Sequence, residues 1–585
     1  MRKILTALAV CTALLSVATV QAEAGKATGG KDHRKGKKAQ GQLGNVLINP
    51  YLYAPLTAII DLGGKHISNA SVRVLGKGKD GVDIKYDVKD SSILTYNGIP
   101  VAGLYPNYRN LVEVKYTMDG KPVQETYKIV TSGIRTVIAD GQWNPWPTVE
   151  PVKVSKGFED RLYFWSNGLK TPFSGEVSWT NGGSLTWDFD AAHKMITDTK
   201  GETRWYLNPE KFDGYRDLKY RGTMQMYQVE SGEWLWMKGQ SYGLMDMMGR
   251  MVWERPMPRG FADGSHEIAL AENGKILLRV SKKNYIRPDG KVVNTVRDHI
   301  IEVDPTNGKI TKVWDMNKIL DPLRDIAILS QNPAAVCMEV DLSKQGEKTK
   351  IEPDAPFGDH AGIGTGRNWA HINSIDYDPS DDTIVISIRQ QSAVAKITRN
   401  DKVKWILGSP DGWKGELAKK VLKPVDAKGK PIKCEFNQCE GEFDWTWAQH
   451  AAFLTGKGTM TVFDNGDGRG MEQPAMKTDA YSRAVEYKIN EKDMTVEQVW
   501  SFGKELGYDY FSTVVSLVQY QKDKNTNLVH FGSRHLFNKK DVSHPTLMEV
   551  SADDKKEVKV EMKMNHVAPS LVSYRSRVID FNKAF

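Results

Sequence analysis

Three histidines, His266, His371 and His450, each open a similar stretch of this 585-residue chain. Each is followed by two apolar runs that flank a polar turn, as in Ile375-Asp-Tyr-Asp-Pro-Ser-Asp-Asp-Thr-Ile-Val-Ile-Ser after His371. A single histidine is usually structural, but three at equivalent places in a repeat predict a shared site. Neutral imidazole can act as a nucleophile or a base, because its ordinary pKa of about 6.5 leaves it mostly unprotonated at neutral pH.

The residues around His371 add groups that bind anions. Strand alternation puts His371 and Asn373 on one face. A turn centred on 379–381 pairs residues whose numbers sum to the same value, so Arg389 falls opposite His371, roughly 5 Å away at Cβ. An imidazole, an amide and a guanidinium together suit a tetrahedral oxyanion such as sulfate or phosphate. Three histidines could instead bind zinc, but Arg389 argues against a cation, and no metal or cofactor is expected.

The same count across the other hairpins predicts two further pairs. Asp464 falls opposite His450, and Arg534 falls opposite Thr513, each within one or two residues. On this basis alone, Asp464 is predicted to orient His450 or its loop.

The elements that position these residues are predicted from a tryptophan repeat. In each repeat a tryptophan ends a short β-like run, and a loop and then a hairpin of two apolar strands follow it. The tryptophans are Trp205, Trp253, Trp314, Trp405 and Trp500. Such units favour a β-propeller of roughly six blades with about 40–50 residues each, spanning residues 146–585. In a propeller the innermost strands open onto one channel, so equivalent strand starts converge. Tandem sandwiches are the alternative.

Residues 43–145 alternate short β-like runs with turns, and Asp119-Gly120 gives a hairpin signal. They predict a small N-terminal β-sandwich, which ends near the Trp/Pro-rich stretch 143–148. The predicted fold class is therefore all-β, a six-bladed propeller preceded by this sandwich.

The first 22 residues have the pattern of a secretory signal peptide, with Arg2 and Lys3 ahead of an apolar run and a small-residue cleavage site. No later stretch is predicted to span a membrane. Residues 23–42 form a basic, flexible linker, which holds much of the excess behind the net charge of +8. Nucleic acid is not an expected partner for an exported protein.

The four cysteines fit export. Cys11 leaves with the signal, and Cys337 is isolated. Cys434 and Cys439 predict a small-loop disulfide in an oxidising compartment. Zinc is the alternative, although a second Cys or His pair at the required spacing is missing.

Several stretches together resemble the bacterial periplasmic arylsulfate sulfotransferase family. The resemblance covers essentially the whole mature chain and is carried by Asn368-Trp-Ala-His-Ile-Asn-Ser-Ile-Asp-Tyr, Ile386-Ser-Ile-Arg, Trp447-Ala-Gln-His, Phe463-Asp-Asn-Gly, the pair Cys434 and Cys439, and Tyr574-Arg-Ser-Arg-Val.

The resemblance implies a periplasmic propeller enzyme, often a homodimer, that moves a sulfuryl group from a phenolic sulfate to a phenol without a nucleotide donor. It implies that His450 is the nucleophile and is transiently sulfurylated. The residues implied to hold the sulfate and assist the phenolic oxygen are His266, His371, Asn373 and Arg389, with Thr513 and Tyr574 as further pocket positions. It also implies a disulfide just before the nucleophile, made by a periplasmic thiol oxidase. Ping-pong kinetics should follow from a covalent intermediate.

Other functions remain open on the residues alone. A hydrolytic arylsulfatase is the nearest, although the Cys-x-Pro-x-Arg pattern of common sulfatases is absent. A nucleotide-dependent sulfotransferase lacks its phosphate loop here, and nothing specific supports a quinone-dependent dehydrogenase. A non-catalytic propeller that only binds a ligand would not need a nucleophile.

Overall fold

The computed structural model describes residues 40–134, 146–169, 178–179, 185–186, 193–212, 223–271, 273–288, 290–324, 368–435, 437–471, 480–536, 543–565 and 571–585. The predicted signal peptide, nearly all of the basic linker, Cys11, Cys337 and Trp143 lie outside the described residues. The described chain is mostly β, as the sequence predicts.

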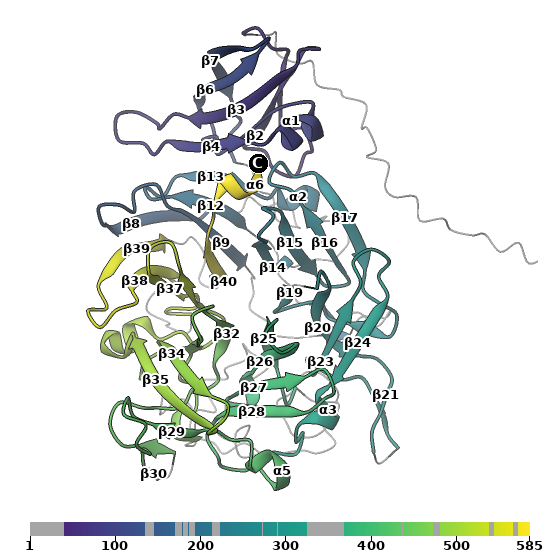
Figure 1. Cartoon of the computed structure of the whole chain (residues 1–585), viewed down its shortest axis with the longest axis vertical. Helices are drawn as coiled ribbons and strands as arrows, with labels where there is room; N and C mark the ends of the chain where they lie inside the picture. Colours follow the sequence, from purple (N-terminus) through teal and green to yellow (C-terminus); the bar gives the residue numbers. More distant parts are fainter. Residues whose placement is uncertain are drawn as a thin grey trace, which may run out of the picture. The chain divides into compact units, whose positions relative to one another are not determined.

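The N-terminal part contains two sheets that share one apolar core (Figure 1). The first sheet has the order β1 (Val46–Ile48), β2 (Thr57–Asp61), β5 (Gly98–Ala102); the second has the order β4 (Ile84–Val88), β3 (Ile67–Val74), β6 (Arg109–Met118), β7 (Lys121–Val130). Helix α1 (Asp90–Tyr96) lies between β4 and β5 in the chain. The Asp119-Gly120 turn joins β6 to β7 with Met118 paired to Lys121, as the hairpin signal predicts.

Six antiparallel sheets of four or five strands follow, and we number them I to VI. Sheet I contains β9 (Leu162–Leu169), β12 (Lys194–Asp198), β13 (Thr203–Tyr206) and β40 (Leu571–Val578); sheet II contains β14 (Thr223–Gln228), β15 (Trp234–Lys238), β16 (Ser241–Met245) and β17 (Met251–Pro256). Sheet III contains β18 (Phe261–Ala262), β19 (Ile268–Leu270), β20 (Ile276–Lys282), β23 (His299–Val303) and β24 (Ile310–Asp315).

The remaining three sheets come later in the chain. Sheet IV contains β25 (Ile372–Asp378), β26 (Thr383–Ile388), β27 (Ala393–Thr398) and β28 (Val403–Gly408). Sheet V contains β32 (His450–Leu454), β33 (Thr459–Asp464), β34 (Arg483–Asn490) and β35 (Thr495–Phe502), with β29 (Lys423–Val425) added in parallel. Sheet VI contains β36 (Leu517–Gln521), β37 (Thr526–Phe531), β38 (Thr546–Ser551) and β39 (Val558–Asn565), extended by β8 (Thr148–Val154).

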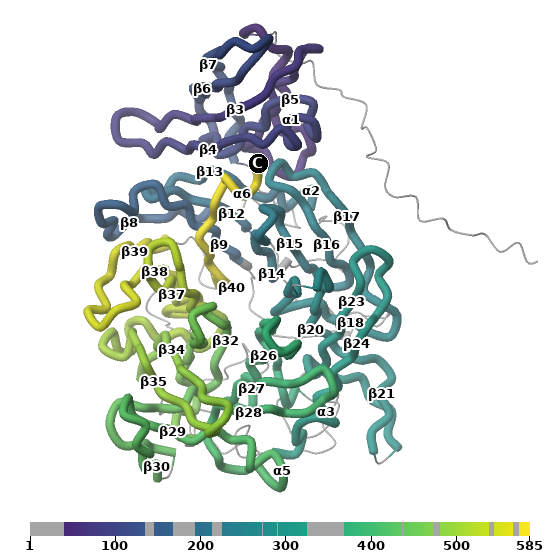
Figure 2. Tube along the Cα trace, viewed as in Figure 1, coloured from purple at the N-terminus to yellow at the C-terminus, as the bar shows by residue number. Residues whose placement is uncertain are grey.

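The first strands of neighbouring sheets contact one another around a common centre (Figure 1). Strand β14 contacts β40, β19 contacts both β15 and β25, and β32 contacts β25 and β36. Strand β36 in turn contacts β40, which completes the series of contacts. Strand β40 is the last strand of the chain, and it pairs with β9 from the first of the six sheets (Figure 2). Each of the five repeat tryptophans lies in the fourth strand of its sheet, counted from the centre: β13, β17, β24, β28 and β35.

The other described elements are short. They are the paired strands β10 (Ser178–Trp179) and β11 (Leu185–Thr186), β21 (Tyr285–Ile286) and β22 (Val292–Val293), β30 (Cys434–Glu435) and β31 (Gln438–Cys439), the helices α2 (Pro209–Phe212), α3 (Met316–Ile319), α5 (Gly415–Ala418) and α6 (Phe581–Ala584), and the 3-10 helices η3 (Arg389–Gln391), η4 (Arg469–Met471) and η6 (Lys504–Tyr510). Within the described ranges, no helix has the length and apolar character needed to cross a bilayer.

Candidate active site

The three histidines stand at the starts of first strands in sheets III, IV and V. His266 lies two residues before β19, His371 directly precedes β25, and His450 opens β32. All three side chains are buried. His266 and His371 have left-handed backbone angles, with φ of 68° and 50°. The chain therefore turns just before each strand, and the two imidazoles lie together with 3.1 Å between their Nε2 atoms.

Sheet IV supplies the arginine and the amide that the sequence places beside His371. Ile372 pairs with Ile388, and the Arg389 N–H donates to the His371 carbonyl at 3.3 Å. The predicted His371–Arg389 pairing is therefore found in the structure. Asn373 is also buried, and its Nδ2 donates to the Gln449 carbonyl at 2.8 Å. Its Oδ1 has no hydrogen-bond partner within the described residues.

His450 is held from both sides of its ring. Its Nδ1 lies 2.7 Å from Oδ1 of Asn465, and its Nε2 lies 3.3 Å from the backbone nitrogen of Val515. Burial and the neighbouring Arg389 hold the pKa of His450 well below its usual range. The ring is therefore neutral near neutral pH, and one nitrogen keeps its lone pair.

Buried arginines surround the histidines. Arg297 Nη1 lies 3.3 Å from Nδ1 of His371, and Arg279 Nη2 lies 3.2 Å from Nδ1 of His266. Burial, followed by the charge of Arg297, lowers the pKa of both His266 and His371 well below the usual value. Asp263 offsets part of the charge through a 2.6 Å ion pair with Arg279.

A buried carboxylate links Arg389 to Thr513. Asp467 accepts from Arg389 Nη2 at 3.1 Å and from the Thr513 hydroxyl at 2.7 Å. Burial raises the pKa of Asp467 to about 6, although Arg389 opposes the shift. Thr513 thus lies in the cluster, as expected, but its hydroxyl contacts the carboxylate that positions Arg389.

Tyr574 also reaches the cluster. Its hydroxyl donates to the His266 carbonyl at 3.0 Å, and its ring lies edge-on to the imidazole. The next residue, Arg575, donates to the Asn373 carbonyl at 2.7 Å and pairs with Glu267. Strand β40 therefore connects sheets III and IV at the site.

Two cross-strand predictions are met in part. Phe463 pairs with His450, one residue from the predicted Asp464 and within the predicted range. Asp464 accepts from the Trp447 N–H at 2.8 Å and pairs with Arg483, so it contacts the loop before His450, one of the two alternatives predicted for it. The β36–β37 register agrees with the count for Thr513 and Arg534, but the ladder begins only at Leu517. Arg534 binds the side chain and carbonyl of Asp509, 2.7 Å away at the carbonyl.

Comparison with known proteins identifies the source of these features. A family model described as arylsulfotransferase (ASST) matches residues 148–575. The chain belongs to the arylsulfotransferase family. A second family model, the arylsulfotransferase Ig-like domain, matches residues 45–132, which contain the two N-terminal sheets. The family membership that the sequence motifs indicate is thereby confirmed.

Two characterised relatives align with most of the chain. Arylsulfate sulfotransferase AssT of Escherichia coli O6:H1 is 46% identical over 561 residues, which cover 92% of this chain and 93% of the relative. Arylsulfate sulfotransferase AssT of Lelliottia amnigena is 44% identical over 567 residues, covering 93% of this chain and 94% of the relative.

Sequence reasoning about this arylsulfotransferase missed several site residues. Asn465 directly follows the residue selected by counting, but it contacts His450 from beyond the end of β33, where the ladder count does not apply. Asp467 follows it in the same Asp-Asn-Gly-Asp stretch, but nothing in the pattern linked it to Arg389. Arg279 lies on the second strand of the hairpin that follows His266, but its contact with that histidine was not predicted. Arg297 lies 74 residues before His371 and carried no signal.

The predicted disulfide is present. Cys434 and Cys439 are bonded and pair across the short β30–β31 hairpin. Among the described residues, no group of three His, Cys, Asp or Glu side chains is placed to hold a metal ion.

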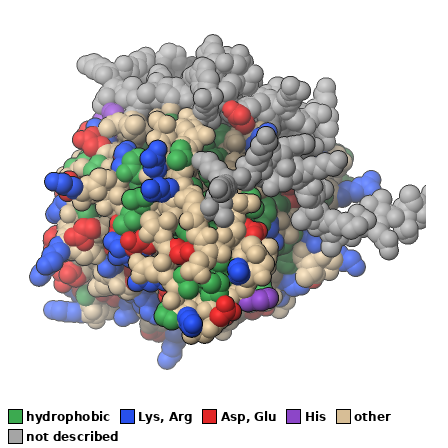
Figure 3. Space-filling model, turned by 90° about the horizontal axis from the view of Figure 1, so that it is seen from above, with side chains coloured by type: hydrophobic (Ala, Val, Ile, Leu, Met, Phe, Trp, Pro, Cys, Tyr) green, Lys and Arg blue, Asp and Glu red, His purple; other side chains and the backbone are tan. Residues whose placement is uncertain are grey.

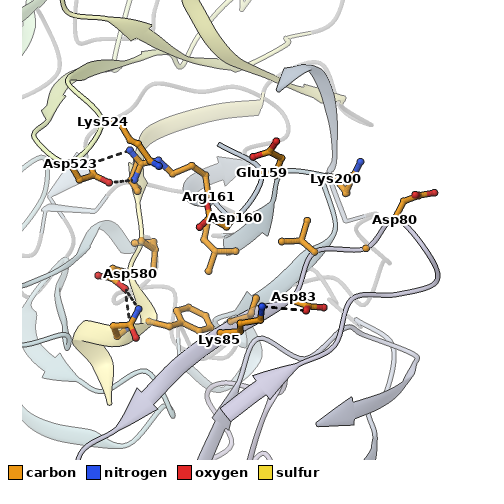
Figure 4. Close-up of a pocket in the computed structure, with 18 of the residues that line it drawn as sticks. Asp80, Asp83, Lys85, Glu159, Asp160, Arg161, Lys200, Asp523, Lys524 and Asp580 are labelled. Carbon is orange, nitrogen blue, oxygen red and sulfur yellow. Dashed lines mark hydrogen bonds and ion pairs between the residues drawn. The ribbon is translucent and has the colours of Figure 1, made fainter. Parts of the chain in front are cut away.

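A cleft of about 770 Å³ lies elsewhere on this arylsulfotransferase. It is lined by both signs of charge, including Asp83 and Lys85 of the N-terminal part and Arg161, which pairs with Asp523 (Figure 4). None of the three histidines lines it. The described surface seen from above carries acidic and basic side chains interspersed (Figure 3).

Proposed function

We propose that this enzyme moves a sulfuryl group from a phenolic sulfate ester to a phenol, in two half-reactions through sulfurylated His450. The observation that carries the proposal is a neutral, buried His450 in a cluster that also holds Arg389 and the His266–His371 pair. A neutral imidazole is a nucleophile, and arginine and amide donors suit the oxygens of the transferred group.

The charge of the site supports a sulfate ester. Four buried arginines lie in the cluster or directly beside it, and three buried carboxylates pair with them; the arginines are Arg279, Arg297, Arg389 and Arg575, and the carboxylates are Asp263, Glu267 and Asp467. This leaves one positive charge in excess among these groups. An aryl sulfate carries one negative charge, whereas a phosphate monoester carries about 1.5 to 2 at neutral pH.

In the first half-reaction, the Nε2 lone pair of His450 gives up its hydrogen bond from the Val515 N–H and forms the bond to sulfur while the bond from sulfur to the aryl oxygen breaks. The arylate leaves with the electron pair of that bond, stabilised by an N–H of the His266–His371 pair. Arg389 and Asn373 donate to the sulfuryl oxygens, whose charge is similar in both half-reactions, so one set of donors serves both.

In the second half-reaction, an acceptor phenol gives its proton to a neutral imidazole of the same pair and attacks sulfur. The N–S bond breaks and its electrons return to Nε2, which restores neutral His450. The proton then passes to solvent or to the released arylate. Thr513 and Tyr574 are proposed to support the pocket, Thr513 through Asp467 and Tyr574 through the His266 carbonyl.

The test is incubation with a chromogenic nitrophenyl sulfate, with and without a phenol. We expect a rapid burst of arylate equal to the enzyme, steady turnover only with phenol, and an acid-labile sulfuryl adduct on His450. His450→Gln should remove the burst and the adduct. Steady arylate release that does not depend on phenol would indicate a hydrolase. Binding of the ester without any burst would indicate a non-catalytic binding protein.

We further propose the architecture and setting that the resemblance implies. The circular series of six sheets is a six-bladed β-propeller at residues 146–585, preceded by a sandwich domain at residues 43–145. The Cys434–Cys439 disulfide supports export to an oxidising periplasm after removal of residues 1–22, with a thiol oxidase forming the bond. Homodimerisation is proposed from the family alone and is tested by light scattering of the mature protein.

A further inference from the structure

We propose that Asn465 is a positioning residue that keeps the proton of His450 on Nδ1, so that Nε2 is the atom that attacks sulfur. The inference rests on the proposed role of His450 as nucleophile, and it identifies the residue that sets which nitrogen can react.

The orientation of the Asn465 amide is fixed by its neighbours. Its Nδ2 lies 2.7 Å from the Ser512 carbonyl and 3.2 Å from the Val515 carbonyl. Carbonyl oxygens only accept hydrogen bonds, so the NH₂ group must face them and Oδ1 must face the other way. Oδ1 lies 2.7 Å from Nδ1 of His450, and an amide oxygen also only accepts. Nδ1 must therefore carry the proton.

A second contact gives the same tautomer independently. The Val515 backbone N–H points at Nε2 of His450 at 3.3 Å. A backbone N–H only donates, so Nε2 presents a lone pair to it. A neutral imidazole has one N–H, and burial beside Arg389 keeps this imidazole neutral. The two contacts thus assign both nitrogens of the ring without conflict.

The positioning group is itself held firmly. Asn465 is fully buried directly after β33, and its carbonyl accepts from the Ser482 hydroxyl at 2.6 Å. The two carbonyls that hold its amide belong to the turn before β36, where Val515 and Ser516 have φ of 55° and 84°. The ring of His450 cannot turn over without breaking the bond to Asn465. After attack, Nδ1–H remains and the new imidazolium donates it to the same oxygen.

The experiment compares four proteins: the wild type, Asn465→Leu, Asn465→Asp and Asn110→Leu. Asn110 is the matched control, because it is also a fully buried asparagine with several backbone hydrogen bonds, but it lies in the N-terminal part. The tautomer is measured in substrate-free enzyme by NMR of ¹⁵N-imidazole-labelled histidine, with the His450 signals assigned by their loss in His450→Gln. Burst rates of arylate release give the first half-reaction.

We expect Nδ1 of His450 to be the protonated nitrogen in the wild type and in Asn110→Leu. Asn465→Leu should lose this preference and slow the burst roughly 10- to 100-fold, with little change in KM for the donor. Asn465→Asp still accepts from Nδ1, so it should keep the tautomer. Its second oxygen faces the Ser512 and Val515 carbonyls without a proton to donate, so this variant should also be less stable. Its negative charge should raise the pKa of His450 and move the acid limb of the burst rate to higher pH.

A protonated Nε2 in the wild type would overturn the proposal, as would an Asn465→Leu burst no slower than that of Asn110→Leu. If Asn465→Leu fails to fold, the wild-type spectrum and Asn465→Asp still decide. A wild type that shows the Nδ1–H tautomer but forms no adduct on His450 would refute the proposed function and leave the hydrogen-bond assignment standing.

Discussion

His530 provides a direct test of how the core of sheet VI depends on pH. It lies in β37, opposite Leu517 on one side and Leu547 on the other, with its ring edge-on to Trp165 at 6.0 Å. The side chain is completely buried, and neither ring nitrogen has a hydrogen-bond partner within the described residues. Burial lowers the pKa of His530 from 6.5 to about 3.

The sign and size follow from proton linkage. Because the pKa is lower in the folded protein, folding stability from this group is fully present above pH 6.5 and is lost as the pH falls toward 3. At about pH 4.5 the unfolded state is almost fully protonated at this residue while the folded state is not. The resulting loss of unfolding free energy, relative to about pH 7.5, is about 3 kcal/mol.

The perturbation is His530→Phe, which fills a similar volume and cannot titrate. Urea unfolding followed by tryptophan fluorescence should show the variant gaining about 3 kcal/mol on the wild type between about pH 7.5 and about pH 4.5. His66→Gln, at an exposed position, should show no such change. A difference between variant and wild type that stays constant within about 1 kcal/mol across this range would refute the argument from burial.

Three further outcomes are expected. Arg389→Lys keeps the charge but loses the planar fork that reaches Asp467, so the arylate burst should slow about 10²- to 10³-fold. The control is Arg399→Lys, in a half-exposed ion-pair network, which should leave the burst rate within threefold of the wild type. Equal effects of the two substitutions would contradict the role of Arg389 in binding the sulfuryl group. Replacing Cys434 and Cys439 together by serine should lower the free energy of thermal unfolding by about 2 kcal/mol, because the closed loop is short. The activity per folded molecule should stay the same. A tenfold loss of that activity would show that the disulfide also supports the active site. EDTA should leave turnover unchanged, since the described residues form no metal-binding group, and a loss restored by added zinc would contradict this.

The sequence predicted the pairing in sheet IV correctly. The count from the turn gives the His371–Arg389 pairing, and the ladder between β25 and β26 has that register at Ile372 and Ile388. The agreement depends on a register shift between Ile372 and Ser374, because the pairs nearer the turn are offset from the count by one residue. The tryptophan repeat marks the fourth strand from the centre in five sheets, and all of these tryptophans except Trp253 are buried.

At His450 the count is off by one residue. The register shifts between His450 and Phe453, and Ala451 has φ of 57°. The regular part of this ladder pairs Phe453 with Thr461 and would place Asp464 opposite His450, whereas the shift places Phe463 there. Asn465 contacts His450 from just beyond the end of β33 and not across the ladder, so counting could not find it. Between β36 and β37 the register agrees with the count, but β36 begins at Leu517, so the ladder does not extend to Thr513 and Arg534.

Left-handed residues at the site explain both why the histidines meet and why pattern alone cannot show it. His266, His371 and Val515 all have positive φ without being glycine, and Val515 is β-branched, for which this region is especially unfavourable. Each such residue costs about 1–3 kcal/mol and persists only when its surroundings determine it. Those surroundings are visible here: Tyr574 binds the His266 carbonyl, Arg389 binds the His371 carbonyl, and Asn465 binds the Val515 carbonyl. Two of the three left-handed residues, His266 and His371, supply imidazoles of the site, and the third, Val515, directs its N–H at His450. Two of these contacts are made by side chains from another sheet, Tyr574 and Asn465, and the third is made by the backbone N–H of Arg389, beside His371 in its own sheet. The contacts from other sheets help to set where the reacting nitrogens lie, and they are beyond the reach of local sequence pattern.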